Sequence, residues 1–278
     1  LIAGALWRER ARDPPHVGRG PALPPQRKAR AVSSEADVPA QPRPAASVIV
    51  VRAAEAGIVT YLVRRSDRSR FVPAAHVFPG GAVEAADREP RAAALVVGAP
   101  RAAPEFARAA LRELFEEAGV LFFCDPRGEP VSLAHAALAR MRGACADGTS
   151  LYAVLEREGL RLDARELFAY SHWLTPEREP IRFDVRFFLA LAPDGQSAQT
   201  DGCEVDDGRW LAPAHALELA ERGELELIYP TRRHLARLAR FDSLEALFAH
   251  ARARTFEAVM PVERAAGVYA LAGGDEAW

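Results

Sequence analysis

A short segment with three closely spaced glutamates constrains this chain more than any other feature. The segment runs from Arg112 to Val120 and reads R-E-L-F-E-E-A-G-V. An α-helix would place its glutamates, Glu113, Glu116 and Glu117, on one face, because residues three and four apart are neighbours on a helix. Like charges this close repel one another and lower helix stability. A hard divalent cation with oxygen ligands would offset that repulsion, whereas a solvated acidic helix face is the alternative interpretation.

A glycine turn, Phe78-Pro79-Gly80-Gly81, precedes the glutamates at some distance. Residues 88–111 form a long spacer that leads to the glutamate segment. Prolines interrupt this spacer at Pro90, Pro100 and Pro104. Because proline lacks the backbone N–H and clashes with the preceding helical turn, one continuous helix is excluded. We therefore expect residues 88–103 to form a surface loop between the glycine turn and the glutamate helix.

Together these segments resemble the signature of the Nudix hydrolases, G-x5-E-x7-R-E-U-x-E-E-x-G-U, in which U is aliphatic. Gly81 takes the first position, and residues 112–120 match the second half. Two differences are visible: Asp87 replaces the first glutamate, and the spacer is longer than the x7 of the signature. The resemblance implies an α/β fold, a Nudix-type α/β/α sandwich with a mixed sheet. This chain would add a long insertion inside the motif and extra helices.

The residues around the motif show strand and helix patterns in alternation. Two β-branched runs, 47–52 and 58–64, predict a hairpin. Pro104 near the start and Gly119 at the end predict the helix that carries the glutamates. Residues 120–123 then predict a short buried strand.

The later residues continue this alternation up to a short C-terminal segment. Helices are predicted at 133–144, at 151–158 and twice within 230–252, and strands at 167–174, 182–192 and 208–211. The first two of these helices have no counterpart in a minimal Nudix domain. The first 45 residues are rich in proline, arginine and alanine without periodicity, so we expect a disordered extension. We expect the Nudix domain at 46–252 and a tail at 253–278.

The composition is typical of a soluble enzyme and argues against several other classes of protein. With 36 basic and 38 acidic residues the net charge is −2, and no basic block predicts nucleic-acid binding. No segment is long and apolar enough to span a bilayer, so no membrane partner is expected. Three cysteines without metal-ligand spacing fit a reducing compartment, and we expect a cytoplasmic location. The sequence leaves open whether the chain is a monomer or a homodimer.

The resemblance also implies roles for the motif residues. Bound Mg²⁺ or Mn²⁺ would be held by Glu113, Glu116, Glu117 and the carbonyl of Gly80. Arg112 would pair with a carboxylate and fix its conformation, a role that suits a planar guanidinium. The base that takes a proton from the attacking water is left open between two residues. Glu113 is the first choice, and Glu204 on a late loop is the second, although Glu204 could equally be one of several solvated acids.

A second motif precedes the glycine turn. From Tyr61 onward the chain resembles the coenzyme A diphosphatase motif within the family, L-L-T-x-R-[SA]-x3-R-x3-G-x3-F-P-G-G. The matching positions are Leu62, Arg65, Ser66, Arg70 and residues 78–81, whereas Tyr61, Val63 and Ala74 differ. Other segments resemble the branch that contains the mammalian peroxisomal coenzyme A diphosphatase. Because a guanidinium fork suits phosphate, Arg70 and Arg65 are candidate substrate-binding residues, with salt bridges to nearby acids as the alternative.

The function implied is metal-dependent hydrolysis of a nucleoside diphosphate linked to another group. Coenzyme A or an acyl-coenzyme A is the expected substrate, with 3′,5′-ADP and (acyl-)4′-phosphopantetheine as products. An ADP-ribose or dinucleotide pyrophosphatase is the alternative enzyme. A non-catalytic ligand-binding Nudix module is the second alternative, but such modules commonly lose helix carboxylates that are all present here.

Overall fold

The chain of 278 residues was analysed as a computed structural model. The structure describes residues 39–55, 57–69, 72–196, 198–200, 205–265 and 268–271. Most of the expected N-terminal extension lies outside these residues, as do Arg70 and Glu204.

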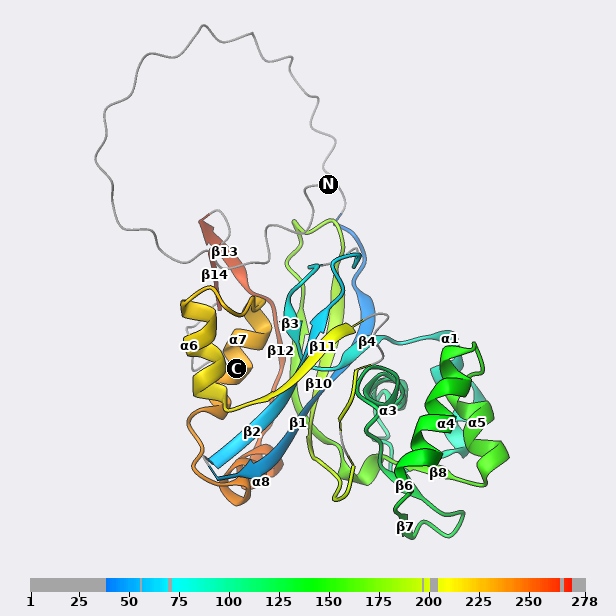
Figure 1. Cartoon of the computed structure of the whole chain (residues 1–278). Coiled ribbons are helices and arrows are strands. Elements are labelled where there is room, and N and C mark those ends of the chain that lie inside the picture. The colour runs from blue at the N-terminus through cyan, green and yellow to red at the C-terminus, as the bar shows by residue number, and fades with distance from the viewer. Residues whose placement is uncertain are drawn as a thin grey trace, which may run out of the picture.

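Within the described residues, a mixed sheet of eight strands forms the centre of the molecule (Figure 1). Its central strand β1, Arg43–Ala54, pairs in parallel with β10, Phe183–Leu191, and antiparallel with β2, Gly57–Arg65. The sheet is extended by β11 (Val205–Leu211) beyond β2, and by β9 (Phe168–Leu174) and β12 (Ala258–Val259) beyond β10. Two short strands, β3 (His76–Val77) and β4 (Gly80–Ala82), pair with β2 and β1.

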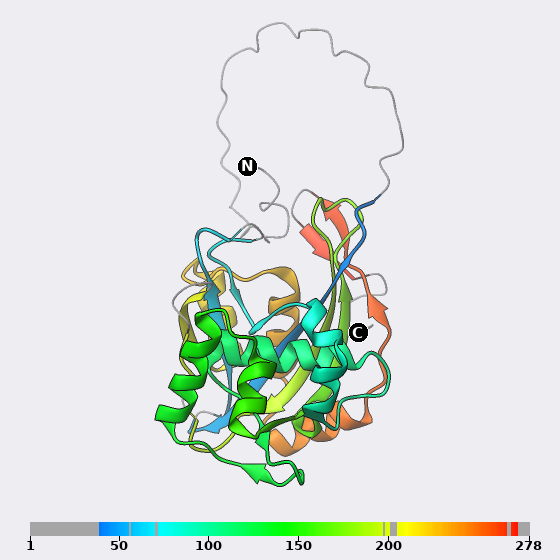
Figure 2. The same ribbon diagram turned by 90° about the vertical axis from the view of Figure 1, so that its right-hand side faces the viewer.

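Strand β1 is apolar on both faces because helices cover both sides of the sheet. Val48 and Val50 point into one core, while Ile49 and Val51 point into the other, as the two-residue period of a strand requires. Figures 1 and 2 show α3 (Pro104–Ala118), α4 (His135–Ala146) and α5 (Leu151–Glu158) on one side, and α6 (Pro213–Glu221), α7 (Tyr229–Leu238) and α8 (Leu244–Ala253) on the other. The expected α/β/α sandwich is confirmed.

The strand predicted at 120–123 is wrong in most of its length. Only Phe123 belongs to a strand, β6, Phe123–Cys124. The backbone of Leu121 is instead satisfied by one side chain: its N–H donates to Gln196 Oε1 at 2.9 Å, and its carbonyl accepts from Gln196 Nε2 at 2.7 Å. A run of apolar residues can therefore be buried without pairing as a β-strand.

The spacer is not the surface loop that its prolines suggested. It starts at the last residue of α1 (Ala85–Arg88) and contains α2 (Pro90–Ala94) and β5 (Val96–Val97). Pro90 occupies the first turn of α2, where a missing N–H costs no hydrogen bond, so this proline begins a helix. Ala92 and Val96 are buried in the core beside α3. Pro90 and Pro104 exclude one long helix, and each instead stands at the start of a separate helix, α2 or α3.

Strand β5 belongs to a second, smaller sheet with the order β5-β8-β6-β7. Strand β5 pairs with β8 (Arg161–Asp163), β8 pairs with β6, and β6 pairs with β7 (Pro130–Val131). The N–H of Leu162 donates to the carbonyl of Leu95 at 2.8 Å, which ties the spacer to the segment after α5. The spacer and the inserted segment that carries α4 and α5 are therefore joined through this sheet.

The folded body extends beyond residues 46–252 at both ends. Strand β1 begins at Arg43, and β12 lies within the segment expected as a tail. A hairpin of β13 (Val262–Ala265) and β14 (Val268–Ala270) follows, and its buried Tyr269 donates to Glu179 at 2.7 Å. Among the described helices, none combines the length and the apolar character needed to cross a bilayer.

Substitution in β5 tests whether the spacer is part of the core. Val96→Thr should lower the melting temperature by about 2 to 12 °C. A buried hydroxyl without a partner costs about 1 to 3 kcal/mol, and each kcal/mol corresponds to about 2 to 4 °C in a chain of this size. Val97→Thr, at the less buried neighbour, is the matched control and should change it by less than about 2 °C. Equal melting temperatures, measured by calorimetry, would show that the spacer is solvated.

Candidate active site

Two consecutive glycines allow the turn before α1 to lie directly against β1 on one side and against Glu113 on the other. A Cβ atom at Gly80 would come within 2.3 Å of the Ala46 carbonyl oxygen, and one at Gly81 within 2.4 Å of Glu113 Oε1. Only glycine fits at such close approach. The hydroxyl of Ser47 donates to the carbonyl of Pro79 at 3.0 Å and holds the turn in place. The turn therefore lies between the central strand and a catalytic candidate.

Helix α3 begins and ends as its sequence predicts. Pro104 stands in its first turn, and Gly119 caps its end in the left-handed conformation at φ 66°. The Gly119 N–H donates to the Phe115 carbonyl at 2.8 Å. Arg112, Glu113 and Glu117 are buried although they are charged, because this face of the helix packs toward the glycine turn.

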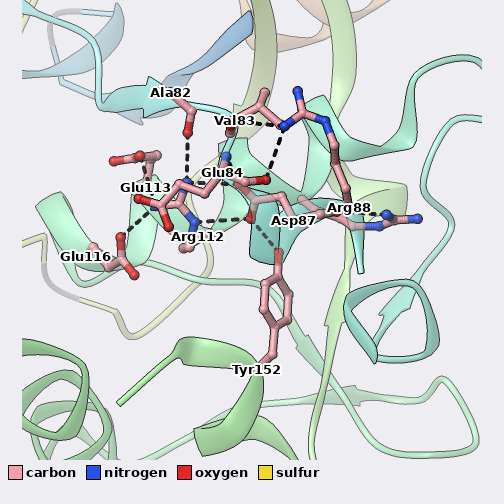
Figure 3. A network of polar contacts seen from close by, with 10 residues as sticks. Ala82, Val83, Glu84, Asp87, Arg88, Arg112, Glu113, Glu116 and Tyr152 are labelled. Atoms are coloured by element: carbon pink, nitrogen blue, oxygen red, sulfur yellow. Dashed lines mark hydrogen bonds and ion pairs between the residues drawn. The ribbon is translucent and has the colours of Figure 1, made fainter. Parts of the chain in front are cut away.

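Arg112 occupies the centre of the acidic cluster (Figure 3). Its Nε and Nη2 donate to Asp87 Oδ1 and Oδ2 at 3.1 and 3.0 Å. Its Nη1 donates to Glu113 Oε1 and to Glu116 Oε2, both at 2.9 Å. A further bond of 2.9 Å joins Nη2 to the Ala82 carbonyl. These contacts use all five N–H donors of the guanidinium, so the expected pairing of Arg112 with a carboxylate is confirmed.

The electrostatics of the cluster follow from burial and from the bonds to Arg112. Burial by itself would lower the pKa of Arg112, but the hydrogen bond to Asp87 and the charges of Glu113, Asp87 and Glu116 together raise it. Burial raises the pKa of Glu116, and the charge of Arg112 partly offsets that rise. Arg112 therefore stays protonated inside the protein, and its positive charge is shared by the three carboxylates that it contacts.

The third glutamate of the motif contacts a different group. Glu117 Oε2 accepts a hydrogen bond from the Gly80 N–H at 2.9 Å. Glu113 and Glu116 contact Arg112 instead. Among the described residues, no three acidic, histidine or cysteine side chains form a ready-made metal cluster. The oxygen donors gathered here are nevertheless of the kind that hard divalent cations prefer, so the set fits such an ion. The predicted metal ligands remain a prediction.

A cavity of about 1000 Å³ joins these carboxylates to an apolar region. Gly80, Gly81, Glu113, Glu116 and Glu117 line its acidic end. Its apolar walls come from β9 and β10 with Trp173, Leu174, Phe183, Val185 and Phe187, and from α4 with Leu138 and Ala139. Arg65 lines the same cavity, as expected of a substrate-binding candidate, whereas Arg70 and Glu204 lie outside the described residues.

Two residues of the inserted helices reach the site, and the sequence motif does not reveal them. Arg142 of α4 lines the cavity and donates from Nη2 to the Glu116 carbonyl at 2.9 Å, where a cation suits the C-terminal end of a helix. Tyr152 of α5 donates to Asp87 Oδ1 at 2.7 Å. The spacing in the sequence contains no signal for either contact, because both depend on how the inserted helices pack.

The fork of Arg112 can be tested by a change that keeps its charge. Arg112→Lys should lower the free energy of unfolding by about 2 to 4 kcal/mol, because a lysine cannot bind the buried Asp87 with two parallel bonds. Urea unfolding followed by circular dichroism would measure this. Arg91→Lys is the control: Arg91 forms an exposed pair with Glu156, so stability should hardly change. Equal losses in the two variants would contradict the assignment.

Several known proteins are similar to this chain in sequence. The sequence model of the NUDT19 Nudix domain matches residues 102–238. Acyl-coenzyme A diphosphatase NUDT19 of Gallus gallus is 31% identical over 269 residues, which cover 77% of this chain and 71% of that protein. The protein of the same name from Homo sapiens is 31% identical over 272 residues, with coverage of 79% and 72%.

A solved structure agrees with these relatives. The crystal structure of a NUDIX hydrolase from Alicyclobacillus acidocaldarius matches with a TM-score of 0.67 and 30% identity, over 76% of this chain and 96% of that chain. Nudix hydrolases generally use divalent metal ions, in keeping with the oxygen donors of the cavity. The chain therefore belongs to the Nudix hydrolase family and is a diphosphatase.

Proposed function

We propose that this enzyme hydrolyses the diphosphate of coenzyme A or of an acyl-coenzyme A with the help of Mg²⁺ or Mn²⁺. The products would be 3′,5′-ADP and 4′-phosphopantetheine or its acyl derivative. One observation carries the proposal: the motif carboxylates and apolar side chains of β9, β10 and α4 line the same cavity. The two relatives named acyl-coenzyme A diphosphatase support the substrate class.

The volume of the cavity and the apolar part of its lining favour coenzyme A over ADP-ribose. A volume of about 1000 Å³ is large for a ligand site and suits a substrate longer than a simple nucleotide. Coenzyme A continues from its diphosphate into a long arm that can carry an acyl chain, and the aromatic and aliphatic side chains of β9, β10 and α4 would contact such an arm. The second half of ADP-ribose is a sugar rich in hydroxyls, which would gain less than a pantetheine arm from contact with the apolar part of the lining.

The chemistry would depend on the acidic end of the cavity. Glu113, Glu116, Glu117 and the Gly80 carbonyl are the proposed metal ligands. Bound divalent cations supply neutralisation of the diphosphate oxygens and make a bound water more acidic. Glu113 is the proposed base, because its carboxylate lies against Gly81 in the cavity wall, and Glu204 remains the second choice.

The arginines would have different roles in this reaction. Arg112 is a positioning residue, since its five donors already hold Asp87, Glu113, Glu116 and the Ala82 carbonyl. Arg65 is a proposed phosphate contact because it lines the cavity. Arg70 is proposed from its place in the coenzyme A motif alone.

A substrate panel tests the proposed function directly. The purified chain would be incubated with coenzyme A, an acyl-coenzyme A, ADP-ribose and NADH, each with Mg²⁺ or Mn²⁺, and the products separated by chromatography. We expect 3′,5′-ADP from the first two substrates at the highest kcat/KM. A preference for ADP-ribose would overturn the coenzyme A assignment.

The metal site leads to a prediction for Glu117. Glu117→Gln should lower kcat at least about a hundredfold, the scale on which catalytic charge stabilisation is lost. The fold should persist, because the amide oxygen can still accept the Gly80 N–H and repulsion among the glutamates is relieved. Glu105→Gln, in the first turn of the same helix, is the control and should retain full activity. Near-normal turnover of Glu117→Gln at saturating Mg²⁺ would contradict the assignment.

Substrate selection leads to a prediction for Arg70. If this residue contacts the 3′-phosphate, Arg70→Ala should lower kcat/KM for coenzyme A about ten- to a hundredfold, the value of one charge-assisted contact. Dephospho-coenzyme A lacks that phosphate, so its kcat/KM should change less. The exposed neighbour Arg68 supplies the control variant Arg68→Ala, for which both substrates should react normally. Equal losses on both substrates would assign Arg70 to the diphosphate or to the fold.

A further inference from the structure

The carboxylate of Asp87 is fully buried and accepts four hydrogen bonds. Oδ1 accepts from Arg112 Nε at 3.1 Å and from the Tyr152 hydroxyl at 2.7 Å. Oδ2 accepts from Arg112 Nη2 at 3.0 Å and from the Glu84 N–H at 2.8 Å. Because a carboxylate has about four lone-pair sites, every acceptor site is filled (Figure 3).

Tyr152 supplies the bond that the motif itself does not provide. It lies on α5, one of the helices expected to have no counterpart in a minimal Nudix domain, and it is 2% exposed. Burial, followed by the charge of Asp87, raises the pKa of Tyr152, so the hydroxyl keeps its proton and acts as the donor. Without it, one acceptor site of a buried charge would have no partner, which is costly in a protein interior.

The contacts run in one direct series from the insertion to the catalytic glutamates. Tyr152 contacts Asp87, and Asp87 binds one edge of the Arg112 guanidinium through Nε and Nη2. The remaining nitrogen of Arg112, Nη1, holds Glu113 and Glu116. Each member of this series except Glu116 has a relative exposure below 9%. A change in the position of Asp87 would therefore move the guanidinium, and with it both glutamates.

We propose that Tyr152 is a positioning residue for the metal-binding carboxylates, acting through Asp87 and Arg112. The inserted helix α5 is then part of the catalytic apparatus as well as part of the core. This inference rests on the proposed function in one respect: Glu113 and Glu116 must be metal ligands. The position of Asp87 in the signature fits this role, since an aspartate, one methylene shorter than the glutamate of the signature, is held here by an additional donor.

A second buried tyrosine, Tyr269, provides a control that distinguishes a positioning role from a purely structural one. Tyr269 donates to Glu179 at 2.7 Å, and both residues are buried, so this pair matches Tyr152 and Asp87 in chemistry and in bond length. Tyr269 packs in the core on the opposite face of the sheet and does not line the cavity. Removal of the Tyr269 hydroxyl should therefore lower the stability of the fold and leave metal binding unchanged.

The experiment compares Tyr152→Phe with Tyr269→Phe in the whole chain without substrate. Binding of Mn²⁺ would be followed by the electron paramagnetic resonance signal of the free ion, and melting temperatures would be recorded for both variants. Loss of a direct partner of a metal ligand typically lowers metal affinity about 10- to 100-fold, and Tyr152 acts at a greater distance. We expect Tyr152→Phe to raise the Kd for Mn²⁺ about three- to tenfold, and Tyr269→Phe to leave it unchanged.

Turnover gives an independent readout of the same effect. Tyr152→Phe should lower activity at limiting Mn²⁺ and regain most of it at saturating Mn²⁺, which a merely less stable protein would not do. A double-mutant cycle with Asp87→Asn then tests the route of the effect. In the Asp87→Asn background, Tyr152→Phe should add little to the Kd, whereas fully additive losses would overturn the proposed route.

The outcomes separate this inference from the proposed function. If the wild type binds Mn²⁺ and the two phenylalanine variants bind it equally well, the inference is wrong and the proposed function stands. A wild type that neither binds Mn²⁺ nor cleaves coenzyme A would overturn both. Should Asp87→Asn fail to fold, the comparison of Tyr152→Phe with Tyr269→Phe still decides the question.

Discussion

The rest of the site depends on one buried guanidinium, that of Arg112. The carboxylates of Asp87, Glu113 and Glu116 would repel one another, and an unpaired buried charge is costly. Arg112 binds all three through charge-assisted bonds and is itself paired at every N–H. Neither the arginine nor the acids would be tolerated inside the protein alone, so they form the site only as a set.

The backbone around this set explains how the acids come to face a cavity. Gly80 lets β4 approach β1, and Gly81 lets it approach Glu113 of α3, so closely that no side chain would fit, and the Gly80 N–H holds Glu117. Helix α3 covers one face of a sheet whose other face is covered by α6, α7 and α8 (Figure 1). The cavity opens where the carboxylates of α3 meet apolar residues of β9 and β10. A charged end and an apolar wall in one cavity suit a substrate with both characters.

The insertions are built into this arrangement. The spacer packs Ala92 and Val96 into the core that α3 shares, and β5 pairs with β8 after α5. Helix α4 forms a wall of the cavity, and α5 brings Tyr152 to Asp87. In a family whose motif is short, such additions can change the shape of the substrate cavity while the chemical residues stay the same.

The sequence by itself determined the elements whose signals are local. The hairpin of β1 and β2, the helix from Pro104 to Gly119 and its three glutamates follow from periodicity and capping residues, and the motif residues indicate the family. Tertiary structure decided the rest. The prolines of the spacer exclude one long helix equally well whether the segment is solvated or packed. The burial of Ala92 and Val96 and the contact of Leu95 with Leu162 show that it is packed. Likewise, no spacing connects Tyr152 with Asp87, because a hydrogen bond across 65 residues depends on how an inserted helix packs.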